Sequence, residues 1–251
     1  MTQKRLIFFV VAVLALYNCS SDNDDSPFSA GSSSESSSDS SSGSEHHNSS
    51  SSFGKNISYI IIEDIRDGKL YKSVEIGTQV WMAENLNYAG EDGNAGRCYQ
   101  DNEDHCETYG RLYTFAEAAC PEGWHLPSSE ELDILLKHVD PNYTGYGNNA
   151  AGTKLKATSG WQRGEGITAP SNPNGTDDYG FAALPGGFCG SQCIQDNFTN
   201  LGTMSYWWTT SMGSPVTLSI TWNVSSSTNS VANAMQSYNN SRFYARCIKQ
   251  R

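Results

Sequence analysis

The seven cysteines of the chain are its most reactive side chains, and their spacing separates metal binding from disulfide formation. One lies near the N-terminus and six follow much later: Cys19, then Cys98, Cys106, Cys120, Cys189, Cys193 and Cys247. Cys189 and Cys193 have the close spacing of a zinc-ligand pair, but no second pair or histidine cluster completes a zinc site. Structural disulfides are therefore favoured over a metal site, and this number of cysteines is typical of an oxidising compartment.

Even pairing of the six later cysteines leaves the first one for a different role. Six cysteines allow fifteen pairings. Proximity in the sequence favours two short bridges and leaves one long one: Cys98–Cys106, Cys189–Cys193 and Cys120–Cys247. The long bridge would stabilise the fold by about 4–5 kcal/mol in the chain-entropy account, because its loop is so large.

Familiar catalytic and cofactor motifs are missing from the chain. The segment Gly147–Lys154 approaches a phosphate-binding loop, but Thr153 separates the second glycine from the lysine, and no buried strand precedes it. The nucleophile elbow G-x-S-x-G and the metal motif H-E-x-x-H are both absent. His125, between Trp124 and Leu126, is expected to be a packed structural residue. The sequence therefore predicts no catalytic residue and no cofactor.

Carboxylates gather in two segments, which raises the question of calcium. These residues are Asp101, Glu103, Asp104 and Glu107 around the predicted Cys98–Cys106 bridge, and Asp177 and Asp178 further on. Calcium takes six to eight oxygen ligands, and neither segment has the spacing of an EF-hand loop. Solvated acidic loops are the simpler interpretation, and no metal site is predicted.

The aromatic residues give the best lead to a ligand. The chain has six Trp and 13 Tyr, whose ring faces can pack on the C–H groups of a sugar while amides bond its hydroxyls. The stretch from Asn223 to Ser241 is polar and is expected to be a loop, so we expect the binding face there. The candidate ligand-binding residues are Trp222, Tyr238, Asn239 and Asn240. Ordinary exposed surface is the alternative for these four.

One strong helix and several strands must position these residues. Ser128 and Glu131 have the spacing of a capping box, and an apolar stripe runs from Leu132 to Val139 at helical spacing. The short apolar segment Leu112–Ala119 is predicted as a second helix. Strands are expected at ISYIII (57–62), LYKSVEI (70–76), YWWTTS (206–211), VTLSITWNV (216–224) and RFYARCI (242–248). Short helices between strands at the two ends predict an α+β fold.

Charge and the N-terminus define the class of protein. With a net charge of −11 and a pI near 4.8, a nucleic-acid partner bound through a basic patch is not expected. No apolar run reaches the ~18 residues of a membrane-spanning helix. Lys4 and Arg5 precede an apolar run from Leu6 to Leu16, which is the pattern of a secretory signal.

Cys19 directly follows this run, and the arrangement resembles a bacterial lipoprotein signal, in which the cysteine carries the lipid. The residues after it, SSDNDDS, resemble the export signal of surface lipoproteins, which implies the outer membrane. An ordinary signal with an incidental Cys19 is the alternative. The serine-rich segment that follows cannot bury enough surface to order itself. We therefore predict a signal peptide (1–18), a disordered tether (19–55) and a folded domain (56–251).

The folded region carries several long motifs in a fixed order: IRDGKLYKSVEIGTQVWMAENLNY, GRLYTFAEAACPEGWHLPSSEEL, AGTKLKATSGW, NGTDDYGFAALPGG, YWWTTS and FYARCIK. This pattern resembles the Fibrobacter succinogenes major paralogous (FISUMP) domain. The family is similar to C-type-lectin-like folds, which implies small twisted antiparallel sheets with two short helices, long loops and disulfides. The Cys120–Cys247 pair resembles the lectin bridge from a helix end to the last strand. The resemblance implies a secreted or surface protein but no reaction.

The expected function is therefore a non-enzymatic binding or adhesion module on the cell surface. Its expected partner is an extracellular glycan, with plant-cell-wall polysaccharide implied by the family context, and its only membrane contact is the lipid. An enzyme is one alternative, because formylglycine-generating enzymes have a related fold and use reactive cysteines. A purely structural envelope protein is the other. Free thiols in the unfolded protein would discriminate thiol chemistry from the rest.

Overall fold

The structure, a computed structural model, describes residues 56–147, 149–164, 169–190, 193, 197–213, 218–237 and 241–249. The predicted signal peptide (1–18), the tether (19–55) and Cys19 lie outside these residues. Within the described ranges, no helix has both the length and the apolar character to cross a bilayer.

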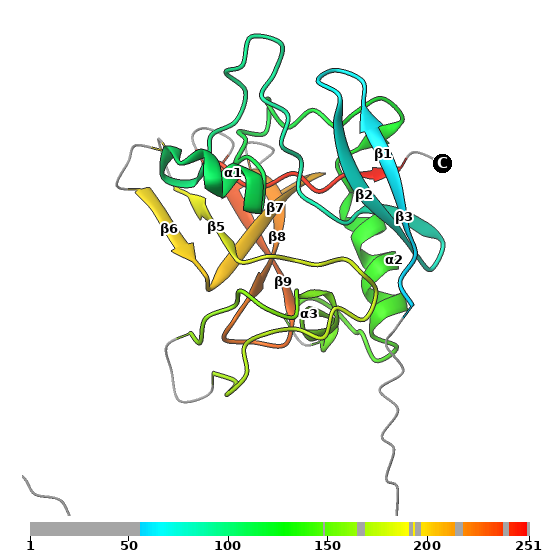
Figure 1. Cartoon of the computed structure of the whole chain (residues 1–251). Helices are drawn as coiled ribbons and strands as arrows, with labels where there is room; N and C mark the ends of the chain where they lie inside the picture. The colour runs from blue at the N-terminus through cyan, green and yellow to red at the C-terminus, as the bar shows by residue number, and fades with distance from the viewer. Residues whose placement is uncertain are drawn as a thin grey trace, which may run out of the picture. The chain divides into compact units, whose positions relative to one another are not determined.

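The first of two five-stranded sheets joins the beginning and the end of the domain (Figure 1). Its strands are β1 (Tyr59–Asp64), β2 (Lys69–Ile76), β3 (Gln79–Met82), β4 (Trp124–His125) and β10 (Ile248–Lys249). Their order is β1-β2-β3-β10-β4, and every pair is antiparallel. The late strand β10 therefore lies between two early strands.

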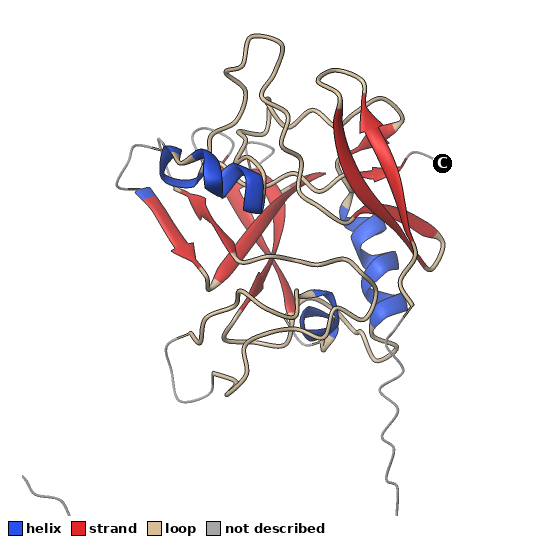
Figure 2. Ribbon diagram, viewed as in Figure 1, coloured by secondary structure: helices blue, strands red, loops and turns tan. Residues whose placement is uncertain are grey.

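The second sheet is built from the later half of the chain. Its strands are β5 (Gly186–Cys189), β6 (Phe198–Leu201), β7 (Met204–Met212), β8 (Leu218–Ser225) and β9 (Val231–Ser237). The order is β6-β5-β7-β8-β9, with β5 and β7 parallel and the other pairs antiparallel. Strands and loops dominate the domain, so the fold is mostly sheet with few short helices (Figure 2).

The helices are η1 (Tyr99–Asp101), α1 (Glu103–Tyr109), α2 (Ser129–Val139) and α3 (Ala151–Leu155). Helix α2 is the predicted one, and its capping box is present: Ser128 Oγ accepts the Glu131 N–H at 3.1 Å, and Glu131 Oε2 accepts the Ser128 N–H at 2.8 Å. The stripe from Leu132 to Val139 is buried, as periodicity predicts.

The predicted helix at Leu112–Ala119 is wrong. Its backbone forms bridges and turns instead, because Leu112 pairs with Arg97 and Tyr113 pairs with Phe243. Tertiary pairing has overridden the local apolar pattern. The neighbouring helix α1 begins inside the acidic segment that was expected to be a solvated loop, where the Asn102 side chain caps it by accepting the Asp104 N–H.

Aromatic rings connect the two sheets through the core. Trp81 of β3 contacts Phe181 edge-on, with ring centroids 5.9 Å apart. Phe181 in turn contacts Trp222 of β8 at 5.7 Å, and Trp222 stacks on Trp207 of β7 at 4.3 Å. All four side chains are fully buried. Phe181 therefore lies where the sheets meet, next to the candidate site described below.

Three disulfides connect the six cysteines of the described region, with the pairing expected from the sequence: Cys98–Cys106, Cys120–Cys247 and Cys189–Cys193. The long one spans 127 positions of sequence with its Cα atoms 6.0 Å apart. It fixes the segment before β4 to the start of β10, so it closes the first sheet covalently.

Candidate functional site

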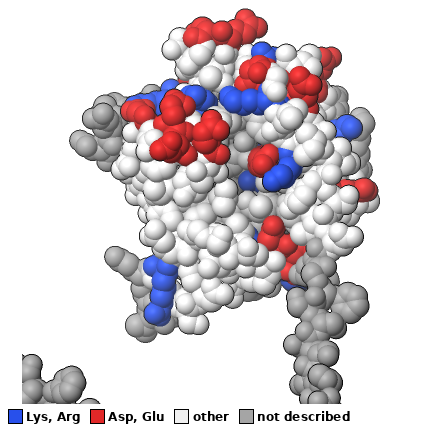
Figure 3. Space-filling model, viewed as in Figure 1, with Lys and Arg blue, Asp and Glu red and all other residues white. Residues whose placement is uncertain are grey.

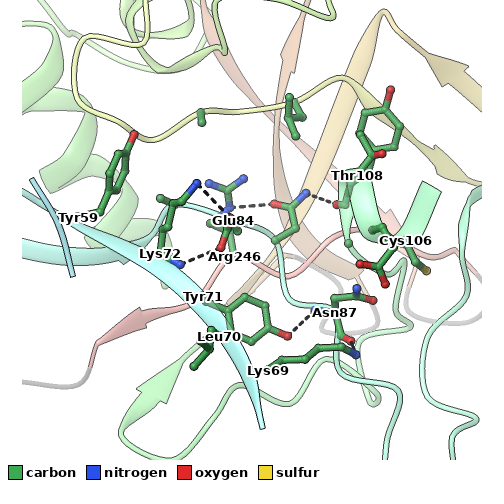
Figure 4. Close-up of a pocket in the computed structure, with 17 residues that line it drawn as sticks. Tyr59, Lys69, Leu70, Tyr71, Lys72, Glu84, Asn87, Cys106, Thr108 and Arg246 are labelled. Atoms are coloured by element: carbon green, nitrogen blue, oxygen red, sulfur yellow. Dashed lines mark hydrogen bonds and ion pairs between the residues drawn. The ribbon is translucent and has the colours of Figure 1, made fainter. Parts of the chain in front are cut away.

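A cavity of 430 Å³ opens between the first sheet and helix α1, and we call it the Arg246 pocket after the charged side chain at its base (Figure 4). Its lining comes from five parts of the chain: Tyr59 and Lys69–Lys72 of the β1–β2 hairpin, Ala83–Asn85 with Asn87, Cys106–Gly110 at the end of α1, Ala182 with Leu184, and Arg246. No single sequence motif contains all of these lining residues.

One wall of the pocket exists because β2 is longer than its partner β3. Strand β3 pairs only with the second half of β2, from Ser73 to Ile76. Beside the first half of β2 runs the segment after β3, held by the Asn87 N–H, which donates to the Tyr71 hydroxyl at 3.0 Å. Lys69 Nζ donates to the Asn87 carbonyl at 2.6 Å. These contacts keep residues 83–87 in place along the strand (Figure 4).

The opposite wall is the C-terminal end of α1. Helix α1 ends at Gly110, whose φ of 80° is a conformation that favours glycine. A side chain there would lie 2.8 Å from Asn85 Cβ and from the Leu86 carbonyl oxygen, so only glycine permits this close approach. Asn85 Nδ2 donates to the Tyr109 carbonyl at 2.8 Å and closes the helix end against the segment after β3.

Arg246 forms the base of the pocket and is 1% exposed. Its Nε donates to Asn85 Oδ1 at 2.8 Å, and Nη1 donates to the carbonyls of Phe181 at 2.6 Å and Met82 at 3.4 Å. The guanidinium also lies 4.6 Å from the centre of the Phe181 ring. Its third nitrogen, Nη2, has no hydrogen-bond partner among the described residues.

Electrostatics at Arg246 are dominated by burial. Burial lowers the pKa of its guanidinium to about 9, and the fields of Glu84 and Asp177 oppose this only in part. No carboxylate of the described residues forms an ion pair with it, since Glu84 is instead paired to Lys72, with Nζ 3.9 Å from Oε1. The pocket therefore contains a buried cation whose nearest partners are neutral oxygens.

A strained residue shapes the pocket next to this arginine. Ala182 has a φ of 50°, a left-handed conformation that costs an alanine roughly 1–2 kcal/mol. Its N–H donates to Asp177 Oδ1 at 2.8 Å, which helps to hold the conformation. Burial raises the pKa of the Asp177 carboxyl. Strain of this kind concentrates at functional sites, and here it aims the preceding carbonyl, that of Phe181, at Arg246.

The rim of the pocket is apolar on the hairpin side. Antiparallel partners share a face, so the register places Ile61 with Lys72 and Glu63 with Leu70 on the same face as Tyr59. Leu70 is 65% exposed and Ile61 is 57% exposed. The Tyr59 ring lies 5.9 Å from Lys72 Nζ. Exposed apolar surface thus borders a polar cavity.

The predicted binding face at residues 223–241 is not a loop where the structure describes it. Strand β8 continues to Ser225 and β9 runs from Val231 to Ser237, paired along their length. Trp222 is 0% exposed and stacks on Trp207, so its prediction as a ligand-binding residue is wrong. The other three candidates lie outside the described residues: Tyr238, Asn239 and Asn240.

The remaining chemical candidates have structural partners. Cys98, Glu103 and Cys106 bring potential ligand atoms within 4.8 Å of one another, but the two sulfurs are joined in a disulfide and offer no thiolate. His125 Nε2 lies 2.8 Å from Glu131 Oε1, and Glu131 also forms the capping box of α2. His125 therefore has a structural partner, although its side chain is 37% exposed rather than packed.

Acidic side chains gather on the surface over α1, in the upper left of Figure 3. Helix α1 contributes exposed Glu103, Asp104 and Glu107. The predicted acidic cluster is therefore real but lies on a helix face rather than in a loop.

Arg246 and Asn85, which both line the pocket, were not predicted as site residues from the sequence. The signal for Arg246 was present, because an arginine stands within YARCI, where every neighbour is apolar or a cysteine. A charge inside such a strand is either paired or placed at a site. Asn85 had no comparable signal, since its role depends on contacts from far along the chain: Trp207 Nε1 donates to its Oδ1 at 2.7 Å, as Arg246 does.

Comparison with known proteins identifies the family. The chain matches the Fibrobacter succinogenes major domain over residues 74–249, which is most of its length and nearly all of the described region. The match includes the segment 83–87, the end of α1, Ala182 and Arg246, whereas Tyr59 and residues 69–72 of the hairpin lie before it. Neither the curated proteins nor the solved structures gave a significant match. The chain therefore belongs to the Fibrobacter succinogenes major domain family.

Proposed function

We propose that this domain is a non-enzymatic binding module displayed on the cell surface, and that the Arg246 pocket holds its saccharide ligand. The observation that carries the proposal is the composition of the pocket. Polar groups line its interior, and exposed Tyr59 and Leu70 form its rim.

This combination matches the amphipathic surface of a sugar. Hydroxyls need donors and acceptors together, and Asn87, Glu84 and Thr108 supply both from different sides of the cavity. The C–H faces of a sugar ring pack on aromatic and aliphatic side chains, which Tyr59 and Leu70 offer. A volume of 430 Å³ falls within the range of about 300–1,000 Å³ for ligand pockets.

The finer fold assignment, a C-type-lectin-like domain, is part of the proposal. It is supported by the late strand β10 pairing between early strands and by the Cys120–Cys247 bridge that closes the sheet. Long connections without helix or strand, such as residues 157–164 and 169–182, provide the irregular loop region that such a fold requires.

Display on the outer membrane is the second part of the proposal, and Cys19 and the tether support it from the sequence. A tether of the Ser26–Ser52 segment alone would span roughly 30 Å as a flexible coil. Plant-cell-wall polysaccharide is the ligand source that the family context favours. Replacing Cys19 by Ser should release the protein from membranes, and equal membrane association of the variant would contradict the anchor.

The thiol-enzyme alternative receives no support from the cysteines. All six cysteines of the described region are in disulfides, whereas a formylglycine-type reaction needs a reactive pair. Thiol titration of the unfolded mature protein tests this directly, and a free pair would revive the alternative.

The binding function is tested with a glycan array and polysaccharide pull-down, using the mature chain with Cys19→Ser. Tyr59→Ala should weaken binding at least severalfold, because it removes the exposed ring at the rim. Met235→Ala is the matched control, because Met235 is 60% exposed on β9, outside the pocket lining. Binding that both variants retain would place the ligand elsewhere. If no glycan binds, the alternative of a purely structural envelope protein is favoured.

A further inference from the structure

We propose that the Arg246 pocket selects saccharides that carry a carboxylate, that is, uronic acids and their oligomers. This inference rests on the proposed function and specifies its ligand class. It comes from the state of Arg246 and from the charges around it.

The first step is the unused hydrogen-bonding capacity of the guanidinium. Nε and Nη1 are bound to Asn85, Phe181 and Met82, which fixes the plane of the group, while Nη2 has no partner among the described residues. Nη2 therefore remains as the donor group that can form a charge-assisted hydrogen bond with one oxygen of a carboxylate. A ligand oxygen near Nη2 would give the third guanidinium nitrogen a hydrogen-bond partner without moving the side chain.

The second step is charge compensation. A buried cation is costly unless an anion or strong hydrogen bonds balance it, and Arg246 has neutral oxygens as its direct partners. The lowered pKa of its guanidinium reflects this burial, and a carboxylate beside it would oppose that effect. The site thus gains more from an anionic ligand than from a neutral one.

The third step is the balance of charges within the pocket. The chain as a whole has a net charge of −11, yet the lining includes three cations, Lys69, Lys72 and Arg246, against two acidic residues, Glu84 and Glu107. Lys69 is engaged with the Asn87 carbonyl and with Asp67, 3.3 Å away. Lys72 pairs with Glu84 only loosely, at 3.9 Å.

Lys72 is therefore the cation at the rim whose side chain can reorient toward an anionic ligand. Its side chain is 55% exposed, and it lies near the pocket interior on the same side as Glu84 and Arg246 (Figure 4). A uronate bound with its carboxylate toward Arg246 would keep its ring at the level of Tyr59 and Leu70. Glu84 and Asp177 are the acidic groups whose fields reach Arg246, and Glu84 would repel an anion unless Lys72 screens it.

The test compares two probes that differ only at the carboxylate group: trigalacturonate and its carboxyl-reduced counterpart, in which each carboxylate becomes a primary alcohol. Isothermal titration calorimetry on the mature Cys19→Ser chain should give at least about tenfold tighter binding of trigalacturonate, the scale of one charge-assisted hydrogen bond. The preference should shrink as ionic strength rises, because the rim of the site is exposed to solvent.

Substitutions in and outside the pocket test which residues cause the preference for trigalacturonate. Lys72→Gln should weaken binding of trigalacturonate severalfold more than it weakens binding of the reduced probe. Lys249→Gln is the matched control, because it removes an exposed lysine on β10 outside the pocket. Arg246→Lys should abolish the preference, with circular dichroism to check that the variant folds. If Arg246→Lys does not fold, Lys72→Gln and the comparison of the two probes still test the proposal.

The outcomes separate the two proposals. Equal or tighter binding of the reduced probe would overturn the carboxylate inference and leave the saccharide-binding function in place. A preference that Lys72→Gln and Lys249→Gln change equally would also overturn it. If neither probe binds and the glycan array is empty, the proposed function fails and the inference fails with it.

Discussion

Replacing Trp222 by Ala should unfold the domain far more readily than an exposed substitution does, although the sequence pattern had placed this residue on a binding surface. Trp222 is 0% exposed, stacks on Trp207 at 4.3 Å with ring planes 20° apart, and contacts Phe181 edge-on. Removing a buried tryptophan costs about 3–5 kcal/mol in transfer free energy and cavity formation. That is a large part of the ~5–15 kcal/mol that keeps a typical domain folded.

The indole nitrogen reduces this cost. Trp222 Nε1 is buried and has no hydrogen-bond partner among the described residues, and such a donor costs about 1–3 kcal/mol in the native state. The alanine variant removes this penalty as well as the ring, so we expect about 2 kcal/mol of net destabilisation, the difference between the midpoints of the two ranges. Trp222→Phe keeps most of the stack and removes the unpaired N–H, so it should cost less than about 1.5 kcal/mol.

Urea unfolding of the oxidised protein, followed by tryptophan fluorescence and circular dichroism, measures both variants. Asn233→Ala is the control, because Asn233 is exposed and lies opposite Trp222 in the β8–β9 register. Its effect should stay within about 0.5 kcal/mol. If Trp222→Ala costs no more than Asn233→Ala, the ring is not part of the core and the second sheet is placed wrongly.

Burial of Lys156, whose Nζ donates to the Ser225 carbonyl at 3.1 Å, lowers its pKa from 10.5 to about 8. The folded protein therefore releases this proton at a lower pH than the unfolded chain does, so folding stability should rise by roughly 2–3 kcal/mol as pH increases from about 8 toward 10.5. Urea unfolding at pH values below those at which tyrosines titrate measures this, and a stability that does not change with pH, or that changes equally in Lys156→Met, would contradict it. Ala182→Gly should stabilise the domain by about 0.5–1 kcal/mol, because glycine adopts a φ of 50° without strain, and a lower thermal midpoint would refute the strain argument. Removing the long bridge with paired Cys120→Ala and Cys247→Ala should cost about 2–5 kcal/mol, while disulfide mapping by mass spectrometry must find these two residues joined.

Local signals predicted those parts of the fold that depend on neighbours in sequence. Helix α2 was predictable because its cap and its stripe both lie within twelve residues, Ser128–Val139. The two short disulfides were predictable for the same reason. The hairpin β1–β2 follows from its apolar strands and the Asp67-Gly68 turn, where Gly68 has a φ of 72°.

The second sheet was harder to predict because its polar residues are buried. In β8, Ser219 and Thr221 are 0% exposed, and their hydroxyls donate to the carbonyls of Thr209 and Ala234. Strand β8 was expected, but β9 (Val231–Ser237) lies in the polar stretch 223–241, which was predicted as a loop. Small hydroxyl side chains that find backbone partners can occupy the interior of a sheet, so polar composition alone did not distinguish a loop from a strand.

The Arg246 pocket was not predictable from local patterns at all. Its walls come from residues as far apart as Tyr59 and Arg246, and they meet only because β10 inserts between β3 and β4. A single sequence carries no signal for that insertion. It does carry the anomaly of a charged residue, Arg246, in an apolar segment that was predicted as a strand, and this was a usable clue.

The insertion of β10 also sets the order in which the domain can form. Residues 243–249 supply β10, an inner strand of the first sheet, together with the base of the pocket and one half of the long disulfide. These residues follow every other strand of the domain in the sequence, so the earlier strands must wait for a contact that spans most of the domain. Contacts of such long range slow folding. A chain without residues 243–249 would therefore lose the closure of the sheet, the long bridge and the pocket together.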